Sequence, residues 1–303
     1  MKRIVFVAIL ISGFSCLFAQ QQPVLSQYML NKYLINPAVA GSSTDFMQGS
    51  GGFPVSVSYR KSWAGIKDAP SMQYLTGQLE VANRMGVGAQ IFNINSGPLS
   101  RTGFTATYAY QIPLNDKGDK LAFGLSGIIY QFKIDKANLS VENKNDPALI
   151  GKEKILVPDA AFGTYYYRDN YYVGLTISQM FNRKIDLLKN EVFEQKQVRH
   201  YYLVGGYRFD INSEFTLEPS VLFKLIEAGV FQADINVLAS YKDMVWAGTS
   251  FRPLSSLVFL AGFKYEKFSI GYSFDMSFTD IRIASYGSHE ILLMYNFNNF
   301  IRK

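Results

Sequence analysis

The sequence predicts an all-β protein: a transmembrane antiparallel β-barrel of the bacterial outer membrane, with about 14 strands and an irregular N-terminal segment. Three observations support this prediction. The chain opens with an export signal. Its 303 residues include 20 Tyr, 24 Phe and 24 Gly but only 2 Trp, which suits twisted strands whose two faces meet different surroundings. From Val55 onward, strand-like segments follow one another to the end of the chain, joined by connections of regularly alternating length.

Residues 1–19 are predicted to be a signal peptide, because a basic start precedes an apolar run over 4–18 and Ala19 is an acceptable cleavage site. A membrane anchor is the alternative, but the run is shorter than the ~20 residues that a helical span needs. Cys16 raises the possibility of lipid attachment, although the usual Leu three residues earlier is missing. Cleavage after Ala19 leaves no cysteine, so neither disulfides nor thiol chemistry are expected.

Residues 20–54 form the irregular N-terminal segment, predicted to be either a plug inside the barrel or a periplasmic element. Its Ser26–Ser42 stretch mixes aromatic, amide and small side chains, and an Asn-Pro pair interrupts any regular helix or strand. Its polar groups are expected to bond to inward residues of the barrel such as Glu218 or Asp234. The candidate plug or docking residues are Ser26, Gln27, Tyr28, Met29, Asn36, Pro37, Ala38 and Gly41.

Residues 55–303 are assigned to the transmembrane β-barrel. In the clearest strand, apolar side chains from Phe268 to Phe278 alternate with Ser, Gly and Asp, so one face suits lipid and the other a polar interior. A soluble β-sandwich also alternates, but it does not explain the regular order of the connections. The segments, each near the ~10 residues of a tilted spanning strand, are 55–63, 71–81, 85–95, 101–112, 120–133, 158–168, 171–180, 198–210, 215–226, 230–241, 244–252, 256–264, 268–278 and 288–297.

The connections after even-numbered strands are tight polar turns, whereas several after odd-numbered strands are long. The long connections cover residues 133–157, 181–197 and 279–287. Bacterial barrels have short periplasmic turns and longer outer loops, so this order fits an even number of strands in a chain that starts in the periplasm. The spacing of Ile185, Leu188 and Val192 predicts a short amphipathic helix in the second long connection.

Charges of both signs fall on predicted inward positions. Pairing them across the lumen costs less than leaving an ion alone in a narrow, poorly hydrated space. A filled or plugged interior is therefore favoured over an open channel. The inward charges are Arg208, Glu218, Lys224, Asp234, Arg252, Asp275 and Glu290.

The sequence carries no motif for catalysis, for a metal or for a cofactor. The two histidines, His200 and His289, are far apart. Some outer-membrane barrels are hydrolases, and His289 beside Glu290 is the candidate pair. Hydrogen bonding at the barrel rim, or pairing with a neighbouring strand, is the simpler interpretation. The net charge of +6 is spread along the chain, so no nucleic acid partner is expected.

Arg60, Trp63 and Pro70 stand where the first strand ends and the second begins. One interpretation is an interfacial Trp with an Arg that extends to the membrane surface. A docking role is the other.

The order of these motifs resembles the PorP/SprF family, outer-membrane proteins of the type IX secretion and gliding system of Bacteroidota. The Ser26–Ser42 stretch is similar to the family's SQYMFN…NPAYAGS opening. The stretch that contains Arg60, Trp63 and Ala69-Pro70 is similar to the family's R-x-x-W…AP pattern. Later matches are Trp246-Ala-Gly-Thr-Ser-Phe-Arg252, Gly271-Tyr-Ser-Phe-Asp275 and Ser288-His-Glu290. Val39 and Leu30 depart from the family's usual Tyr and Phe, and a short tail extends past Phe297.

The resemblance covers almost the whole mature chain. It implies an integral outer-membrane protein that binds, without catalysis, and supports secretion or surface anchoring of a cognate cargo protein with a type B C-terminal signal domain. It also implies contact with outer-membrane lipids and with peptidoglycan-linked components in the periplasm. The alternative is a channel or hydrophobic-solute transporter gated by the N-terminal segment. The candidate barrel and partner residues are Arg60, Trp63, Pro70, Trp246, Arg252, Asp275, His289 and Glu290.

Overall fold

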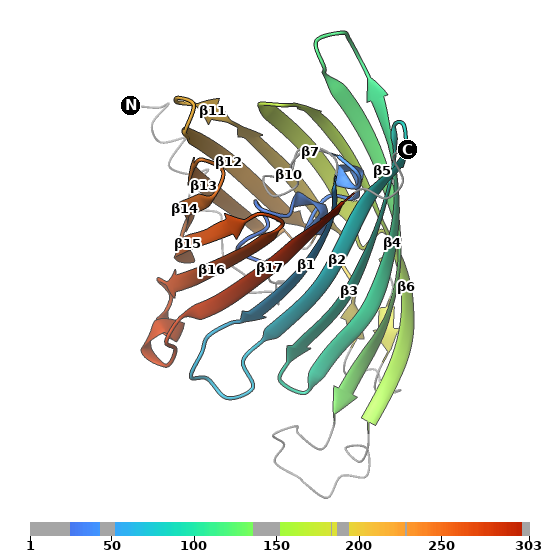
Figure 1. The fold of residues 1–303 in the computed structure, drawn as a ribbon. Helices are drawn as coiled ribbons and strands as arrows, with labels where there is room; N and C mark the ends of the chain where they lie inside the picture. The colour runs from blue at the N-terminus through green and yellow to red at the C-terminus, as the bar shows by residue number, and fades with distance from the viewer. Residues whose placement is uncertain are drawn as a thin grey trace, which may run out of the picture.

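The computed structural model describes residues 25–42, 52–135, 152–182, 184–186, 194–227 and 229–298. They form a closed antiparallel barrel of fourteen strands with a short irregular segment inside it (Figure 1). The predicted fold class and strand number are therefore confirmed. The predicted signal peptide, residues 1–19, lies outside the described residues.

The barrel strands follow the chain order, and each pairs with its neighbours in sequence. They are β1 (Gly52–Lys61), β2 (Ser71–Ala82), β3 (Met85–Ser96), β4 (Leu99–Pro113), β5 (Lys120–Asp135), β6 (Lys152–Arg168), β7 (Tyr171–Ser178), β10 (His200–Tyr207), β12 (Phe215–Ile226), β13 (Phe231–Tyr241), β14 (Val245–Arg252), β15 (Ser256–Tyr265), β16 (Phe268–Ser277) and β17 (Ser288–Asn298).

The ring closes where β1 meets β17, with Val55 opposite Tyr295 and Arg60 opposite Glu290. Strand β10 pairs with β7 on one side and β12 on the other, which completes the circle. A two-residue strand, β11 (Phe209–Asp210), is added beside β12. Each of the fourteen strands is therefore paired with a strand on both sides, as the membrane interior requires.

Period-two alternation sorts the side chains between the two faces of the barrel wall. In β16, Phe268, Tyr272 and Met276 are exposed on the outside, whereas Ser273 and Asp275 are buried inside. The same order along the other strands gives a broad outer belt of exposed apolar residues. This belt suits contact with lipid, and the inner face is small and polar.

Two predictions about the long connections are wrong. Strands β5 and β6 continue into the connection predicted for 133–157, because Lys133 pairs with Lys154. In the 181–197 connection, β8 (Lys184–Asp186) pairs with β9 (Glu194–Lys196), so Ile185 lies in a hairpin and not in a helix. Leu188 and Val192 lie outside the described residues. The described residues contain no helix that is long and apolar enough to cross a membrane.

Residues 25–42 lie inside the ring of strands (Figure 1) and carry two short 3-10 helices, η1 (Lys32–Leu34) and η2 (Pro37–Val39). The Asn36 side chain accepts a hydrogen bond from the Ala38 amide (2.9 Å), which caps η2 just before a proline at its first position. The Asn-Pro pair that interrupts the sequence pattern therefore starts a local turn.

This segment runs between the two ends of the barrel. Leu25 packs near Met72, at the start of β2, on the end that carries the long connections. Gly41 lies against Gly86, at the start of β3, on the end of the short turns. We refer to these as the long-loop end and the short-turn end of the barrel.

Candidate functional site

Six residues that the sequence singled out meet inside the barrel near its long-loop end. They come from the N-terminal segment and from β1, β14, β16 and β17, and all are buried. We call this group, together with Asp234 of β13, the buried charge network. The six residues are Ser26, Gln27, Arg60, Arg252, Asp275 and Glu290.

Ser26 is the centre of the network. Its hydroxyl lies 3.0 Å from both carboxylate oxygens of Asp275, to which it can donate. The same oxygen accepts hydrogen bonds from Arg60 Nη1 (2.7 Å) and Arg252 Nη2 (3.1 Å). A hydroxyl can act as donor and acceptor at once, so one small side chain joins a carboxylate and two guanidinium groups.

Glu290 holds the backbone of the segment. Its carboxylate accepts the amide of Ser26 (2.6 Å) and the amide of Gln27 (3.1 Å). Arg60, its register partner on β1, approaches to 3.5 Å. The Gln27 side chain also donates to the Glu290 backbone carbonyl (3.3 Å).

Arg60 and Arg252 share the carboxylate of Asp275, at 2.7 Å and 2.9 Å respectively. Arg252 also contacts Asp234 of β13 (2.9 Å). Lys224 of β12 is fully buried in the adjoining wall. The three acidic groups are thus accompanied by three cations, as a desolvated cluster of charges requires.

A second ion pair holds the segment nearer the short-turn end of the barrel. Lys32 Nζ lies 3.3 Å from Glu218 of β12 and 4.6 Å from the centre of the Tyr172 ring. The Tyr172 hydroxyl donates to the same carboxylate (3.1 Å). Lys32 is not among the predicted site residues, although it is the only charged residue between Leu25 and Ser42. An isolated charge in such a stretch is a signal that could have identified it.

The remaining polar groups of the segment bond to the barrel wall, but to partners other than those predicted. Tyr28 accepts a hydrogen bond from Asn236 (2.7 Å), and Asn31 donates to Ser56 (2.8 Å). Asn36 donates to the Thr164 carbonyl (3.0 Å). Glu218 instead receives Lys32, and Asp234 receives Arg252.

Glycines of the barrel wall give the segment its space. A Cβ at Gly124 would overlap the backbone of Pro37 and Ala38, and a Cβ at Gly86 would overlap the Ala40 carbonyl. At Gly163 it would overlap the Asn36 side chain. The wall and the segment therefore approach closer than any side chain between them would allow.

The segment fills most of the lumen beside it. Met29, Leu30, Ala38 and Val39 belong to one apolar cluster that includes Trp246 of β14. Beside Leu34 and Ile35, a cavity of about 140 Å³ remains. Its walls carry both aromatic and polar side chains, including Tyr130, Arg101 and Asp159.

The structure separates Arg60 from Trp63. Arg60 faces the lumen like Ser56 and Ser58 of the same strand, so the interpretation of an Arg that extends to the membrane surface is wrong. Trp63 lies beyond the end of β1, exposed, with its amide bonded to Ser288 (3.0 Å). The Pro70 carbonyl accepts the Ser62 amide (2.8 Å), which holds the base of the same connection.

His289 and Glu290 are neighbours in sequence but point to opposite faces of β17. Glu290 is buried inside, whereas the His289 ring faces outward and its Nδ1 lies 2.6 Å from the Tyr272 hydroxyl of β16. The two side chains therefore do not converge on one substrate position. No group of acidic, His or Cys side chains within the described ranges could hold a metal ion.

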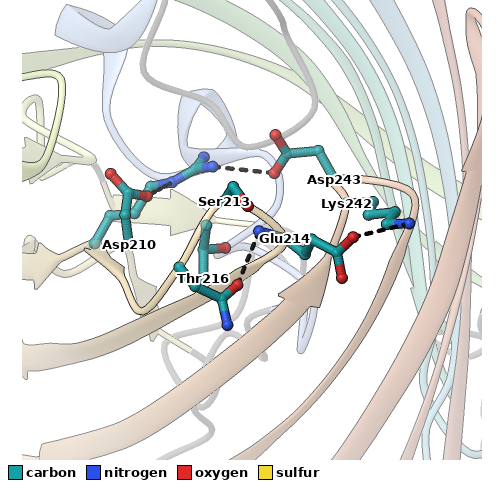
Figure 2. A pocket seen from close by; sticks show the side chains of 8 residues that line it. Asp210, Ser213, Glu214, Thr216, Lys242 and Asp243 are labelled. Atoms are coloured by element: carbon teal, nitrogen blue, oxygen red, sulfur yellow. Dashed lines mark hydrogen bonds and ion pairs between the residues drawn. The ribbon is translucent and has the colours of Figure 1, made fainter.

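Arg208 is not an inward charge, contrary to the prediction. β10 ends one residue earlier, so the alternation no longer applies, and Arg208 pairs with Asp243 (3.0 Å) at the short-turn end. Figure 2 shows this surface pocket, where Lys242 also pairs with Glu214 (3.0 Å). The hydrogen bond to Glu214 raises the pKa of Lys242. Opposite charges alternate here and largely compensate one another.

Comparison with solved structures shows that outer-membrane barrels share this fold. The toluene transporter TbuX of Ralstonia pickettii has a TM-score of 0.50 at 10% identity, over 88% of this chain and 92% of that one. A FadL homologue of Pseudomonas aeruginosa has the same TM-score and identity, over 87% and 98%. The chain therefore has the fold of an outer-membrane β-barrel. At this identity the likeness extends to the fold alone.

Comparison with curated proteins gives no match. A family profile, described as type IX secretion system membrane protein PorP/SprF, matches residues 17–295. The matched range contains the N-terminal segment and all residues of the buried charge network. The chain therefore belongs to the PorP/SprF family of type IX secretion system membrane proteins.

Proposed function

We propose that this protein is a binding component of the type IX system. It supports secretion or surface anchoring of a cognate cargo protein and performs no catalysis. Family membership supports the link to type IX secretion. The cargo expected from the motif resemblance is a secreted protein with a type B C-terminal signal domain. Periplasmic peptidoglycan-linked components are the expected partners at the short-turn end, and a role in gliding follows if the cargo is an adhesin.

One observation carries the proposal of a protein-binding surface. Large apolar residues that stand exposed at the long-loop end include Trp63 (38% exposed), Leu254 (88%), Ile283 (85%) and Tyr286 (81%). We call this set the apolar rim. It lies beyond the strand ends, on the β1–β2, β14–β15 and β16–β17 connections. Exposed apolar clusters rimmed by polar residues are typical of protein interaction sites.

Backbone geometry supports the same surface. The Tyr286 amide donates to Ala64 (2.7 Å), so the first and last connections hold each other. Trp63 and Leu254 have positive φ angles of 48° and 61°. Bulky side chains rarely adopt this conformation, and such strain concentrates at functional positions. Long connections face the outside in bacterial barrels, where surface cargo is found.

The double variant Leu254→Ser with Tyr286→Ser tests this proposal. We expect loss of the cognate cargo from the cell surface, with the amount and the heat resistance of the barrel unchanged. The matched control is Leu114→Ser with Ile211→Ser, which removes two exposed apolar side chains at the short-turn end. Equal amounts of surface cargo in both double variants would contradict an outer binding surface.

Transport through the lumen is the second candidate function, since TbuX is a toluene transporter. Two observations argue against it: the N-terminal segment lies in the lumen, and the cavity beside Leu34 and Ile35 is small. Purified protein in liposomes is expected to give neither ion conductance nor solute uptake. Uptake by the unmodified protein would favour the transport function over binding.

A further inference from the structure

We propose that the N-terminal segment also acts in assembly, as a clamp on the seam between the first and last strands of its own barrel. This inference goes beyond cargo binding and does not depend on it. The seam is the β1–β17 pairing, which runs from Gly52 opposite Asn298 to Lys61 opposite His289. It joins the two ends of the barrel sequence, so it forms only after the whole chain is present.

The inner face of the seam has a charged pair at its long-loop end. Arg60 and Glu290 are direct register partners, 3.5 Å apart, with side chains 6% and 0% exposed. The inward residues next to them are Ser58 and Leu292, which offer no further charge. A buried carboxylate with one distant cation is costly, so Glu290 needs additional donors.

The segment supplies these donors from one turn of chain. The amides of Ser26 and Gln27 bind the Glu290 carboxylate, and the Ser26 hydroxyl accepts a bond from Arg60. Both strands of the seam are therefore bound by the same two residues. A further contact, from Asn31 to Ser56 of β1 and to Thr76 of β2, holds β1 on the side away from the seam.

The contacts extend from the seam into the wall beside it. Asp275 of β16 and Arg252 of β14 bind Ser26 directly. The Gln27 side chain lies against Gly271 of β16, where a Cβ would overlap it. The segment thus joins β1 to three of the last strands of the chain, β14, β16 and β17, and not merely to one neighbour.

Seam closure and segment binding must stabilise each other. Without the segment, Glu290 loses two amide donors and Asp275 loses a hydroxyl donor, while both remain in the wall. Without the closed seam, Ser26 and Gln27 lose the carboxylate that orders them. Coupling between two such events is reciprocal. An unoccupied lumen is therefore expected to weaken the β1–β17 pairing before the pairings elsewhere.

Crosslinking across the seam tests the clamp. Cysteines replace Val57 and Leu293, which are register partners on the outer face of the seam. The control pair replaces Phe104 and Ile129, outer register partners on β4 and β5. Each pair is combined with the intact segment, with deletion of 25–42, and with Gln27→Pro. This substitution removes the amide donor and the side-chain contacts of Gln27 and retains the other residues of the segment.

We expect the yield of crosslink at the seam to fall several-fold in both segment variants, while the β4–β5 yield is unchanged. Adding a peptide of residues 25–42 during refolding of the deletion variant should restore the seam yield. Equal yields at seam and control pairs in Gln27→Pro would overturn the clamp, as would failure of the peptide to restore the seam. Purified protein without cargo is used, so the result is independent of the cargo proposal.

Discussion

The substitution Asp275→Asn is expected to abolish stable insertion, or to lower the free energy of unfolding by about 3–5 kcal/mol, as removal of one partner from a buried ion cluster does. Asp275 accepts hydrogen bonds from Arg60, Arg252 and Ser26. An Asn of the same shape keeps one acceptor oxygen but turns an NH2 group toward a guanidinium group, and it leaves the buried cations without their shared negative charge. Heat resistance of the folded band on gels and urea unfolding in micelles measure the loss.

The matched control for this prediction is Asp243→Asn, which removes the acid from an ion pair of similar length at the short-turn end. Its partner Arg208 lies 3.0 Å away, but both side chains are accessible to solvent. Exposed ion pairs contribute less than about 1 kcal/mol. If the two Asp→Asn variants unfold at the same urea concentration, the buried charge network does not hold the barrel together.

The substitution Gly124→Ala is expected to displace the N-terminal segment from the wall. The added methyl group would overlap the backbone of Pro37 and Ala38. Backbone atoms cannot move aside by a change of rotamer, so overpacking of this kind costs about 1–3 kcal/mol or expels the segment. The measurement is the susceptibility of residues 25–42 to added protease, together with the midpoint of unfolding.

Gly127→Ala is the control on the same strand, since a Cβ there meets no atom. It faces outward and should leave both measurements unchanged or slightly improved, because Ala restricts the unfolded chain more than Gly does. Identical behaviour of the two alanine variants would mean that Gly124 does not face an ordered segment.

Much of the barrel could be predicted from the sequence because two signals are local. Alternation of apolar and polar residues is read directly along each strand, as from Phe268 to Ser277, and it fixes which side chains face lipid. Connection length then fixes the even number of strands. The same signals fail where alternation stops. Arg208 was assigned inward because the end of β10 at Tyr207 is not marked by any turn residue.

The candidate site could be predicted only as a set of separate motifs. Ser26, Arg60, Arg252, Asp275 and Glu290 were each singled out, yet nothing in the sequence says that they touch. Their contact depends on barrel closure, which brings β1 beside β17 across more than 200 positions. Long-range pairing of this kind leaves no local trace.

The direction in which side chains point at the ends of strands is the other feature that could not be predicted from the sequence. Trp63 and Arg60 are three residues apart, and from the sequence alone they read as one motif at the end of the first strand. The strand ends at Lys61, so the Arg still follows the inward alternation while the Trp belongs to a turn with positive φ. Lys32 was missed because a single lysine in a polar segment has many explanations until its partner, Glu218, is known.

Residues 25–42 are held inside the barrel by the buried charge network and by close packing on the wall. Hydrogen–deuterium exchange of the unmodified protein in micelles tests this most directly, because the amides of Ser26 and Gln27 bond to Glu290 in the interior. We expect peptides covering 26–42 to exchange as slowly as peptides from β1 and β17. Complete exchange of these peptides within seconds, with the strands still protected, would contradict it.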